Sequence, residues 1–405
     1  MDRKWSFPIV EIFSAATPCT LGPMFASEIR DSQWMEIRSA ALRSNLSLFR
    51  GLVSEKTQVA AVVKASAYGH GLAEVVEAAA GHVDWFAVHS AAEAAKVRDV
   101  SIDHPVLIMG LVTPADEHLL DHRTHVMVSC VEVLRWLGSL KKRLGIKVPV
   151  HLKVDTGTHR QGIPVDAIPE FCREAAGLGL EIVGVATHFA NIEDTLEHQF
   201  ARSQLDRFLE TLAVLKSEGI EPRWTHAACS AAALLFREAD FTLARVGISM
   251  YGHWPSRETR LSWVLGHPQG SLNLEPVLSW KTVVGQIQEV RRGETVGYGR
   301  TWTALRDSRV AVLPMGYSDG YPRCLGNRAR VLVHGRPVPV VGRVCMNITL
   351  ADVTDDPDVG VGDEVVLIGK QGQAEITVED LAETAGTINY EFLARLSPDV
   401  ERRLV

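Results

Sequence analysis

The 405-residue chain is 46% hydrophobic and 22% charged, a balance that is typical of a folded globular protein and excludes the disordered and fibrous classes. This length predicts two or three domains, each with a sizeable core. The formal net charge is −7 and no basic run is interleaved with aromatic residues, so we expect no nucleic-acid partner.

Cysteine usage and hydropathy indicate the compartment. The six cysteines are scattered without a Cys-x-x-Cys pair, which favours reduced thiols in a cytoplasmic protein over a disulfide framework. No apolar stretch is long enough to span a bilayer, so we expect no membrane partner. We also predict no metal site. Pro8 and Glu11 interrupt a short apolar stretch near the N-terminus, so we interpret residues 1–33 as an irregular extension rather than a cleaved targeting signal.

The next part of the chain, which we assign to one domain of residues 34–268, alternates between short apolar runs and helical patterns, as parallel β/α units do. Eight runs predict strands, at residues 59–65, 85–90, 106–110, 125–130, 150–155, 182–189, 224–230 and 241–250. Helical patterns lie between them, among them residues 72–80, 91–99, 131–142 and 204–219. The seventh and eighth runs would also suit short helix segments. Eight alternating units predict an α/β fold with a (β/α)8 barrel of the TIM type.

The pattern changes after the segment 263–276, which we interpret as the connection to a second domain. Residues 269–405 contain many short apolar runs punctuated by glycine, and one helical pattern at residues 378–386. We therefore predict a C-terminal domain that is mainly β.

Barrel active sites lie at the carboxyl ends of the strands, and this rule selects a few polar residues. They are Lys64, Asp155, His188, Ser230, Arg245 and Gly247. Each has a structural alternative: a solvated lysine, an Asx turn at Asp155, a hydrogen-bonded structural histidine, or a helix N-cap at Ser230. The apolar run before Lys64 favours a functional lysine at the mouth of the barrel.

A lysine held in apolar surroundings has a lowered pKa, and its free amine is then a nucleophile. An amine and a carbonyl form a Schiff base. The late strands of a barrel commonly bind phosphate, and Ser230 and Gly247 are expected there. The sequence therefore favours pyridoxal 5′-phosphate (PLP) as the cofactor.

At this point the sequence resembles the alanine racemase family, PLP enzymes of fold type III with an N-terminal barrel and a C-terminal β domain. The family's lysine motif reads V-K-A-N-A-Y-G-H-G, and residues 63–71 read VKASAYGHG, with Ser66 in place of Asn. Further matches follow in family order from about Trp34 onward: HLKVDTG with Arg160, THFA with His188, THAACSAA from His226, ARVGISMYG with Arg245, GYG with Tyr298, GYSDGYPR with Tyr317, VGRVCMN with Met346, and INYE with Tyr390.

The resemblance implies how the cofactor would be held. Lys64 would bind PLP covalently, and Arg245 would face the pyridine nitrogen, with His188 close by. Because an arginine donates hydrogen bonds and is never deprotonated, it favours an unprotonated ring nitrogen, a poorer electron sink that discourages transamination. The residues that would bind the phosphate are Tyr68, Ser230, Gly247, Ile248 and Tyr390.

The resemblance also implies the reaction, the interconversion of L- and D-alanine, a peptidoglycan precursor. Racemisation removes a proton from one face of the α-carbon and delivers one to the other, which requires two acid/base groups. By resemblance these are Lys64 and Tyr298 of the partner subunit, so we expect a homodimer with shared active sites. Arg160 and the backbone at Met346 would hold the carboxylate of the small amino-acid substrate. The supporting residues would be Lys153, His226 and Tyr317.

Several residues depart from the family pattern. They are Thr158, His159 and Gln161 in place of Met, Gly and Leu, Cys229 in place of Asn, and Asn347 in place of Asp. Thr158 and Asn347 would lie near the substrate, so serine or a broader set of small amino acids stays open beside alanine. A decarboxylase of the same fold type would have an acidic residue where Arg245 stands. A non-catalytic PLP-binding protein would lack the C-terminal domain.

Overall fold

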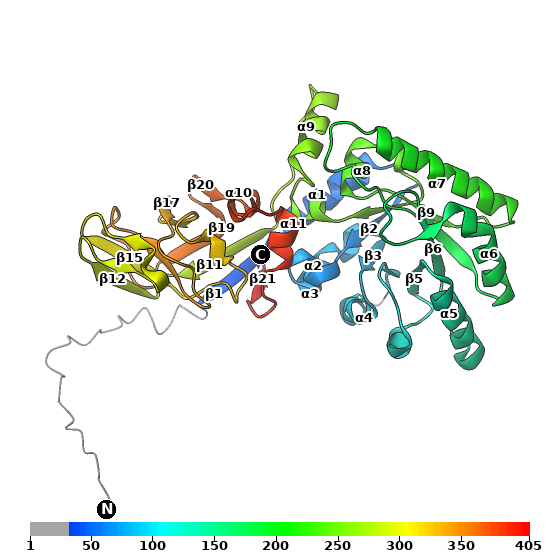
Figure 1. Ribbon diagram of the computed structural model, residues 1–405, viewed down its shortest axis with the longest axis horizontal. Coiled ribbons are helices and arrows are strands. Elements are labelled where there is room, and N and C mark those ends of the chain that lie inside the picture. Colours follow the sequence, from blue (N-terminus) through cyan, green and yellow to red (C-terminus); the bar gives the residue numbers. More distant parts are fainter. Residues whose placement is uncertain (1–31, 102) are drawn as a thin grey trace, which may run out of the picture.

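The computed structural model describes residues 32–101 and 103–405. Figure 1 shows a barrel of strands surrounded by helices and, beside it, a β-rich part that contains the C-terminus. The predicted fold, a (β/α)8 barrel followed by a mainly-β domain, is confirmed. The predicted extension at residues 1–33 and Cys19 lie almost wholly outside the described residues.

Eight parallel strands form the barrel sheet, in the order β10-β2-β3-β4-β5-β6-β8-β9. Their bounds are β2 Gln58–Val62, β3 Trp85–Val88, β4 Val106–Ile108, β5 Thr124–Val128, β6 Val150–Asp155, β8 Ile182–Ala186, β9 Trp224–His226 and β10 Leu243–Val246. Each of the eight predicted runs overlaps one of these strands, the seventh and eighth included. Most of their residues are buried, as expected for parallel strands with helices on one side and a packed barrel interior on the other. A short strand, β7 Ile163–Pro164, pairs with β6.

The barrel closes between β9 and β10 through two backbone hydrogen bonds. The N–H of Thr242 donates to the carbonyl of Thr225 at 3.0 Å, and the N–H of Arg245 donates to the carbonyl of Ala228 at 3.0 Å. On its other side β10 pairs with β2, where Arg245 lies opposite Ala60. The closure therefore brings the strand of Arg245 next to the strand that precedes Lys64.

Helices follow most of the barrel strands. Their bounds are α1 Ser39–Leu52, α2 Lys64–Tyr68, α3 Leu72–Ala79, α4 Ala91–Val100, α5 Val131–Leu144, α6 Ile168–Gly177, α7 Gln199–Ser217, α8 Ser230–Leu235 and α9 Arg257–Gly266. Local signals set their ends: Ser90 and Glu93 form a capping box at the start of α4, and Gly145 ends α5 with a φ of 71°. In the described part of the chain, no helix has the length and hydropathy to cross a bilayer.

The main sheet of the second part has the order β17-β16-β19-β11-β1-β21, with β20 paired to β19. Its strands are β1 Gln33–Ile37, β11 Leu278–Val283, β16 Arg330–Val333, β17 Arg336–Pro339, β19 Glu364–Gln371, β20 Ala374–Ile376 and β21 Arg402–Leu404. β1 pairs antiparallel with β11 and parallel with β21. The first and last described strands are thus neighbours in this sheet, although the sequence suggested that residues from 34 onward belong with the barrel. The predicted domain limits themselves stay a prediction.

Two smaller sheets and two helices complete this part. The sheets are β12-β15-β18, with β12 Gln286–Val290, β15 Ser308–Leu313 and β18 Thr349–Asp352, and β13-β14, with β13 Thr295–Val296 and β14 Trp302–Thr303. Helix α10, Val378–Ala385, lies where the sequence predicted one. Helix α11, Asn389–Ala394, was not predicted, because six residues are too few to show a helical period.

Candidate active site

Lys64 directly precedes a left-handed turn and lies beyond the last residue of its strand. β2 ends at Val62, and the three residues from Ala65 to Ala67 have φ of 53–54° and ψ of 46–52°. Left-handed backbone costs roughly 1–2 kcal/mol for each residue that is not glycine, so the surrounding structure must hold the turn. One such contact is a carboxylate of α4: Glu93 Oε1 accepts a hydrogen bond from the Ala65 N–H at 2.7 Å.

Gly69 ends this turn against the second domain. Its φ is +80°, and a Cβ at this position would lie 2.0 Å from the carbonyl oxygen of Leu393 in α11. Figure 1 shows α11 beside α2. In addition, Arg402 of β21 donates from Nη2 to the carbonyl of Gly69 at 2.8 Å. Both contacts require the C-terminal domain, so this domain fixes the geometry of the lysine turn.

The turn carries Tyr68 into a cluster of tyrosines with the buried Tyr251 and the partly buried Tyr390. Its ring centroid lies 5.1 Å from that of Tyr251 and 6.1 Å from that of Tyr390, and the Tyr251 hydroxyl donates to the carbonyl of Val62 at 2.8 Å. A Cβ at Gly247 would lie 2.7 Å from the Tyr68 hydroxyl oxygen. Glycine at this position therefore allows the hydroxyl to reach the backbone of residues 247 and 248.

The electrostatic setting of Lys64 favours its free amine. Burial lowers the pKa of Lys64, and the positive charge of Arg160 lowers it further, whereas Glu93 and Glu193 act in the opposite direction. Lys64 Nζ lies 6.0 Å from the ring centroid of Tyr68. A lysine of lowered pKa therefore lies beyond the carboxyl end of β2, near the ring of Tyr68.

Arg245 is buried, and its side chain is held by groups at the carboxyl ends of two strands, β8 and β9. Its Nη1 donates to His226 Nδ1 at 2.7 Å, and its Nη2 donates to the carbonyl of Thr187 at 2.9 Å and to His188 Nδ1 at 3.4 Å. Burial lowers the pKa of Arg245 to about 10, so the guanidinium keeps its charge at neutral pH. Burial also lowers the pKa of His188 and of His226 well below the usual value, so both rings are neutral and can accept these hydrogen bonds.

Lys153, on β6, is a second buried amine at the same end of the barrel. Burial lowers its pKa well below the usual value, and the charges of Arg245 and Arg160 act in the same direction. Asp155, two residues later, accepts hydrogen bonds from the N–H groups of Gly157 at 2.9 Å and His159 at 3.1 Å. These bonds match the Asx turn that we considered as the structural alternative for Asp155.

The residues predicted to bind a phosphate lie together around Ser230. Ser230 Oγ accepts hydrogen bonds from the N–H of Gly247 at 2.9 Å and of Ser249 at 3.5 Å, and Ile248 lies between these two residues. Tyr390, from α11 of the second domain, completes the group through its contact with Tyr68. Hydroxyl and amide groups from four segments of the chain thus lie around Tyr68 and Ser230, and Lys64 Nζ is 6.0 Å from the Tyr68 ring centroid.

Sequence reasoning missed Glu193, which lies in the same cluster. Its Oε2 accepts a hydrogen bond from the Tyr390 hydroxyl at 3.1 Å, and its Oε1 lies 3.7 Å from Cys229 Sγ. Burial raises the pKa of this carboxyl. Glu193 follows the THFA motif in a segment without periodic structure, so no local pattern indicated that it would face the lysine.

The remaining predicted residues are exposed. Arg160 is exposed in the loop after β6, while the exposed fractions of Tyr298, Met346 and Tyr317, all on the second domain, are 74%, 56% and 42%. Tyr317 and Met346 occupy adjoining loops, because the N–H of Ser318 donates to the carbonyl of Met346 at 3.0 Å. Within the described chain, none of the hydrogen bonds of these three second-domain residues reaches the group around Lys64.

Both domains of this chain match a known protein family. Residues 37–255 match the N-terminal domain of alanine racemase, and residues 277–404 match its C-terminal domain. This chain belongs to the alanine racemase family. An alanine racemase of Symbiobacterium thermophilum is 40% identical over 91% of this chain and 96% of its own length. An alanine racemase of Leptospira interrogans is 36% identical over 94% of this chain and 98% of its own.

Solved structures of the family have the same fold. An alanine racemase of Clostridium difficile superposes with a TM-score of 0.85 at 30% identity, and covers 93% of this chain and 97% of that one. The alanine racemase of Bacillus anthracis with bound L-Ala-P gives a TM-score of 0.84 at 32% identity, over 92% of this chain and 95% of that one.

Two residues that depart from the alanine racemase pattern are held in place by hydrogen bonds. Thr158 donates from its hydroxyl to the carbonyl of His188 at 2.6 Å. Asn347 donates from Nδ2 to Ser318 Oγ at 2.7 Å. The hydroxyl proton of Thr158 is therefore engaged, and its oxygen can act towards a ligand only as an acceptor.

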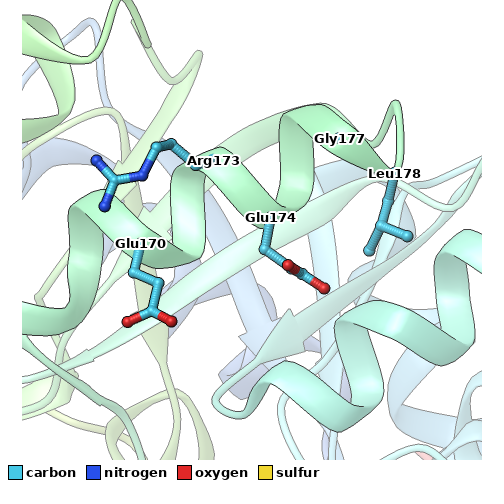
Figure 2. A pocket seen from close by; sticks show the side chains of 5 residues that line it. All are labelled: Glu170, Arg173, Glu174, Gly177 and Leu178. Atoms are coloured by element: carbon cyan, nitrogen blue, oxygen red, sulfur yellow. The ribbon is translucent and has the colours of Figure 1, made fainter.

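Two hollows of the described structure lie away from this site. One, of about 330 Å³, is formed on the outer side of α6 by Glu170, Arg173, Glu174, Gly177 and Leu178 (Figure 2). Glu174 is bound there by Arg135 of α5, with Nε to Oε1 at 2.7 Å, so this hollow belongs to a packed helix surface. The other, of about 510 Å³, is lined by residues at the amino ends of the barrel strands, among them Gln58, Trp85, His125 and Trp224.

Proposed function

We propose that this chain interconverts L- and D-alanine with PLP as its cofactor. The observation that carries the proposal is a lysine of lowered pKa at a barrel mouth, together with a buried arginine, Arg245, whose charge lowers that pKa further and which can only donate hydrogen bonds. Membership of the alanine racemase family supports the same reaction.

The residues at the site fit PLP. Tyr68, Ser230, Tyr390 and the N–H groups of Gly247 and Ile248 would hold its phosphate, because convergent hydroxyl and amide donors suit a dianion. The Tyr390 hydroxyl and the Gly247 N–H, which donate here to Glu193 and Ser230, would exchange these bonds for bonds to the phosphate. In the described chain every side-chain hydrogen bond of Arg245 uses Nη1 or Nη2, so its Nε–H is left to donate to the pyridine nitrogen. The tight approach of Gly247 to Tyr68 leaves no room for a side chain where the phosphate would lie.

Two side chains would move the proton. PLP, when bound, withdraws electrons from the amino acid and so makes its α-hydrogen acidic. Lys64 Nζ would take or deliver a proton on one face of the α-carbon, and Tyr298 Oη of the partner subunit would do so on the other. A tyrosine has a pKa of about 10, so the neighbouring cations Arg160 and Arg245 would be needed to favour its phenolate.

Tyr298, Met346 and Tyr317 support a homodimer with shared sites. All three are exposed on the second domain. Exposed apolar patches usually mark an interface, so we expect the partner subunit to cover these residues. In the dimer, Arg160 and the backbone at Met346 would hold the substrate carboxylate. Lys153 would orient Arg160 after carbamylation, a reaction that needs the neutral amine its lowered pKa favours.

Thr158 and Asn347 favour one alternative, a racemase of serine or of several small amino acids. The Thr158 oxygen can accept a hydrogen bond from a substrate hydroxyl, which the methionine usual in the family cannot do as well.

A cytoplasmic location is also proposed. It is supported by the free thiols of the described cysteines, Cys130, Cys172, Cys229, Cys324 and Cys345.

The first test is chiral chromatography after incubation with PLP and single enantiomers of alanine and serine. Lys64→Ala should abolish racemisation and also covalent PLP labelling after borohydride reduction, measured by mass spectrometry. Lys56→Ala, at an exposed lysine, is the control and should keep both. Labelling that persists in Lys64→Ala would contradict the role of Lys64, and equal turnover of serine and alanine would favour the alternative.

Shared sites can be tested by complementation. Lys64→Ala and Tyr298→Phe should each be inactive or slow, with α-hydrogen exchange of the two enantiomers affected unequally by Tyr298→Phe. In a mixed dimer, one site has Lys64 and Tyr298 intact on opposite subunits. An equal mixture that has exchanged subunits should therefore regain roughly a quarter of the wild-type activity. A mixture that regains none would contradict the shared site.

A further inference from the structure

A chain of three histidine rings runs through the barrel interior below Arg245. His226 Nε2 lies 2.9 Å from His151 Nδ1, and His151 Nε2 lies 2.9 Å from His125 Nδ1. His226 is on β9, His151 on β6 and His125 on β5, and successive rings meet edge to face with centroids 5.1 Å apart. The rings connect Arg245 with the hollow at the amino ends of the strands, which His125 lines.

The direction of these hydrogen bonds is fixed at the Arg245 end. An arginine only donates, so His226 Nδ1 must be the acceptor of the 2.7 Å bond, and the proton of the neutral His226 ring is on Nε2. His226 Nε2–H then donates to His151 Nδ1, which places the proton of His151 on Nε2. By the same reasoning His151 donates to His125 Nδ1. All three rings therefore share one tautomer.

The barrel provides space for this chain of rings. Gly184 lies on β8, between β6 and β9, and a Cβ there would lie 2.2 Å from His151 Nδ1. The register of β6 against β8 shifts between Val150 and His151. Trp85 packs edge to face on His125, with centroids 4.5 Å apart. The absence of a side chain at residue 184 is what allows His151 to reach across to His226.

The rings are also kept neutral. Burial lowers the pKa of His151 and His226 well below the usual value, and burial together with Arg98 and Arg223 lowers the pKa of His125 to about 4. A protonated ring has two donors and cannot accept, so a neutral chain is required for each ring to accept from the one above it.

We propose that His125 and His151 are positioning residues, which hold Arg245 in its orientation through His226. Without an acceptor at residue 125, the hydrogen bond that favours the Nε2–H tautomer of His151 is lost. A proton on His151 Nδ1 would face the Nε2–H of His226, and the resulting shift in His226 would place an Nδ1–H against the guanidinium at 2.7 Å. Arg245 would then turn away. The effect on catalysis rests on the proposed function, whereas the tautomers do not.

The test uses two substitutions of nearly equal size. His125→Asn keeps an acceptor, Oδ1, close to the position of Nδ1, and His125→Leu removes it. His122→Leu, at an exposed histidine in the same segment, is the control. The first measurement is 15N NMR of histidine ring nitrogens, with His125, His151 and His226 assigned by single substitutions. We expect all three to carry the proton on Nε2, and a protonated Nδ1 on any of them would overturn the proposal.

The second measurement is the kcat of racemisation with thermal unfolding alongside. We expect His125→Leu to lower kcat about tenfold, the equivalent of one lost hydrogen bond at Arg245, with His122→Leu unchanged and His125→Asn restoring most of the rate. Equal rates for His125→Asn and His125→Leu would overturn the proposal. If the wild-type protein racemises nothing, the proposed function fails, but the NMR result still decides between the tautomers.

Discussion

His70, next to the lysine turn, should make this protein less stable in mild acid. The ring is fully buried, its Nδ1 lies 3.0 Å from the carbonyl of Tyr68, and its centroid lies 4.4 Å from that of Tyr251. Burial and then His253 lower the pKa of His70 to about 3. Because an unfolded histidine has a pKa of about 6.5, the unfolded state binds the proton first as the pH falls. The contribution of His70 to stability is therefore complete above about pH 6.5 and is lost between pH 6.5 and pH 3.

At pH 5 the unfolded pKa lies about 1.5 units above the solution pH, which corresponds to a loss of about 2 kcal/mol for this one residue. Urea unfolding followed by tryptophan fluorescence at pH 8 and pH 5 measures it. His70→Asn is the matched variant, since its Nδ2 can keep the bond to Tyr68 while it has no group that titrates. We expect the wild type to lose about 2 kcal/mol more than the variant between these pH values. An equal loss in both proteins would refute the reasoning.

Three substitutions test other features through thermal unfolding. Ser66→Asn should stabilise the protein by about 0.5 to 1 kcal/mol, because Asn tolerates left-handed backbone better than Ser; a lower Tm would contradict this. Gly184→Ala should destabilise it by about 1 to 3 kcal/mol, since the new methyl group meets His151, and an unchanged Tm would argue against that contact. Arg402→Ala should cost about 1 to 3 kcal/mol by removing the donor to the Gly69 carbonyl, whereas Arg402→Lys should recover part of it.

The barrel was predictable because its signals are local. Each parallel strand is buried on both sides and so appears as a short apolar run, and each polar residue after such a run points to the active end. Lys64, His188 and Arg245 were found in this way. The capping residues that start α4 and end α5 are also local, as is the late helix α10.

Other features depend on contacts between distant segments, which a single sequence does not reveal. The left-handed turn at Ala65 is held by Glu93 and, further along, by Arg402. Glu193 faces the site from a loop without a period. His125 and His151 looked like ordinary strand residues, and only the barrel closure aligns them with His226.

The pairing of β1 with β21 has a consequence for synthesis on the ribosome. The β1 strand is made first among the described strands, but its parallel neighbour, from Arg402 to Leu404, is made last among them. Domains generally fold as their residues emerge, so the barrel can form while this sheet still lacks its edge. Arg402 also reaches Gly69, so the turn of Lys64 gains this support only after residue 402 has been made and has left the ribosome. The turn that carries the amine of Lys64 would therefore be completed only after the barrel itself has been made.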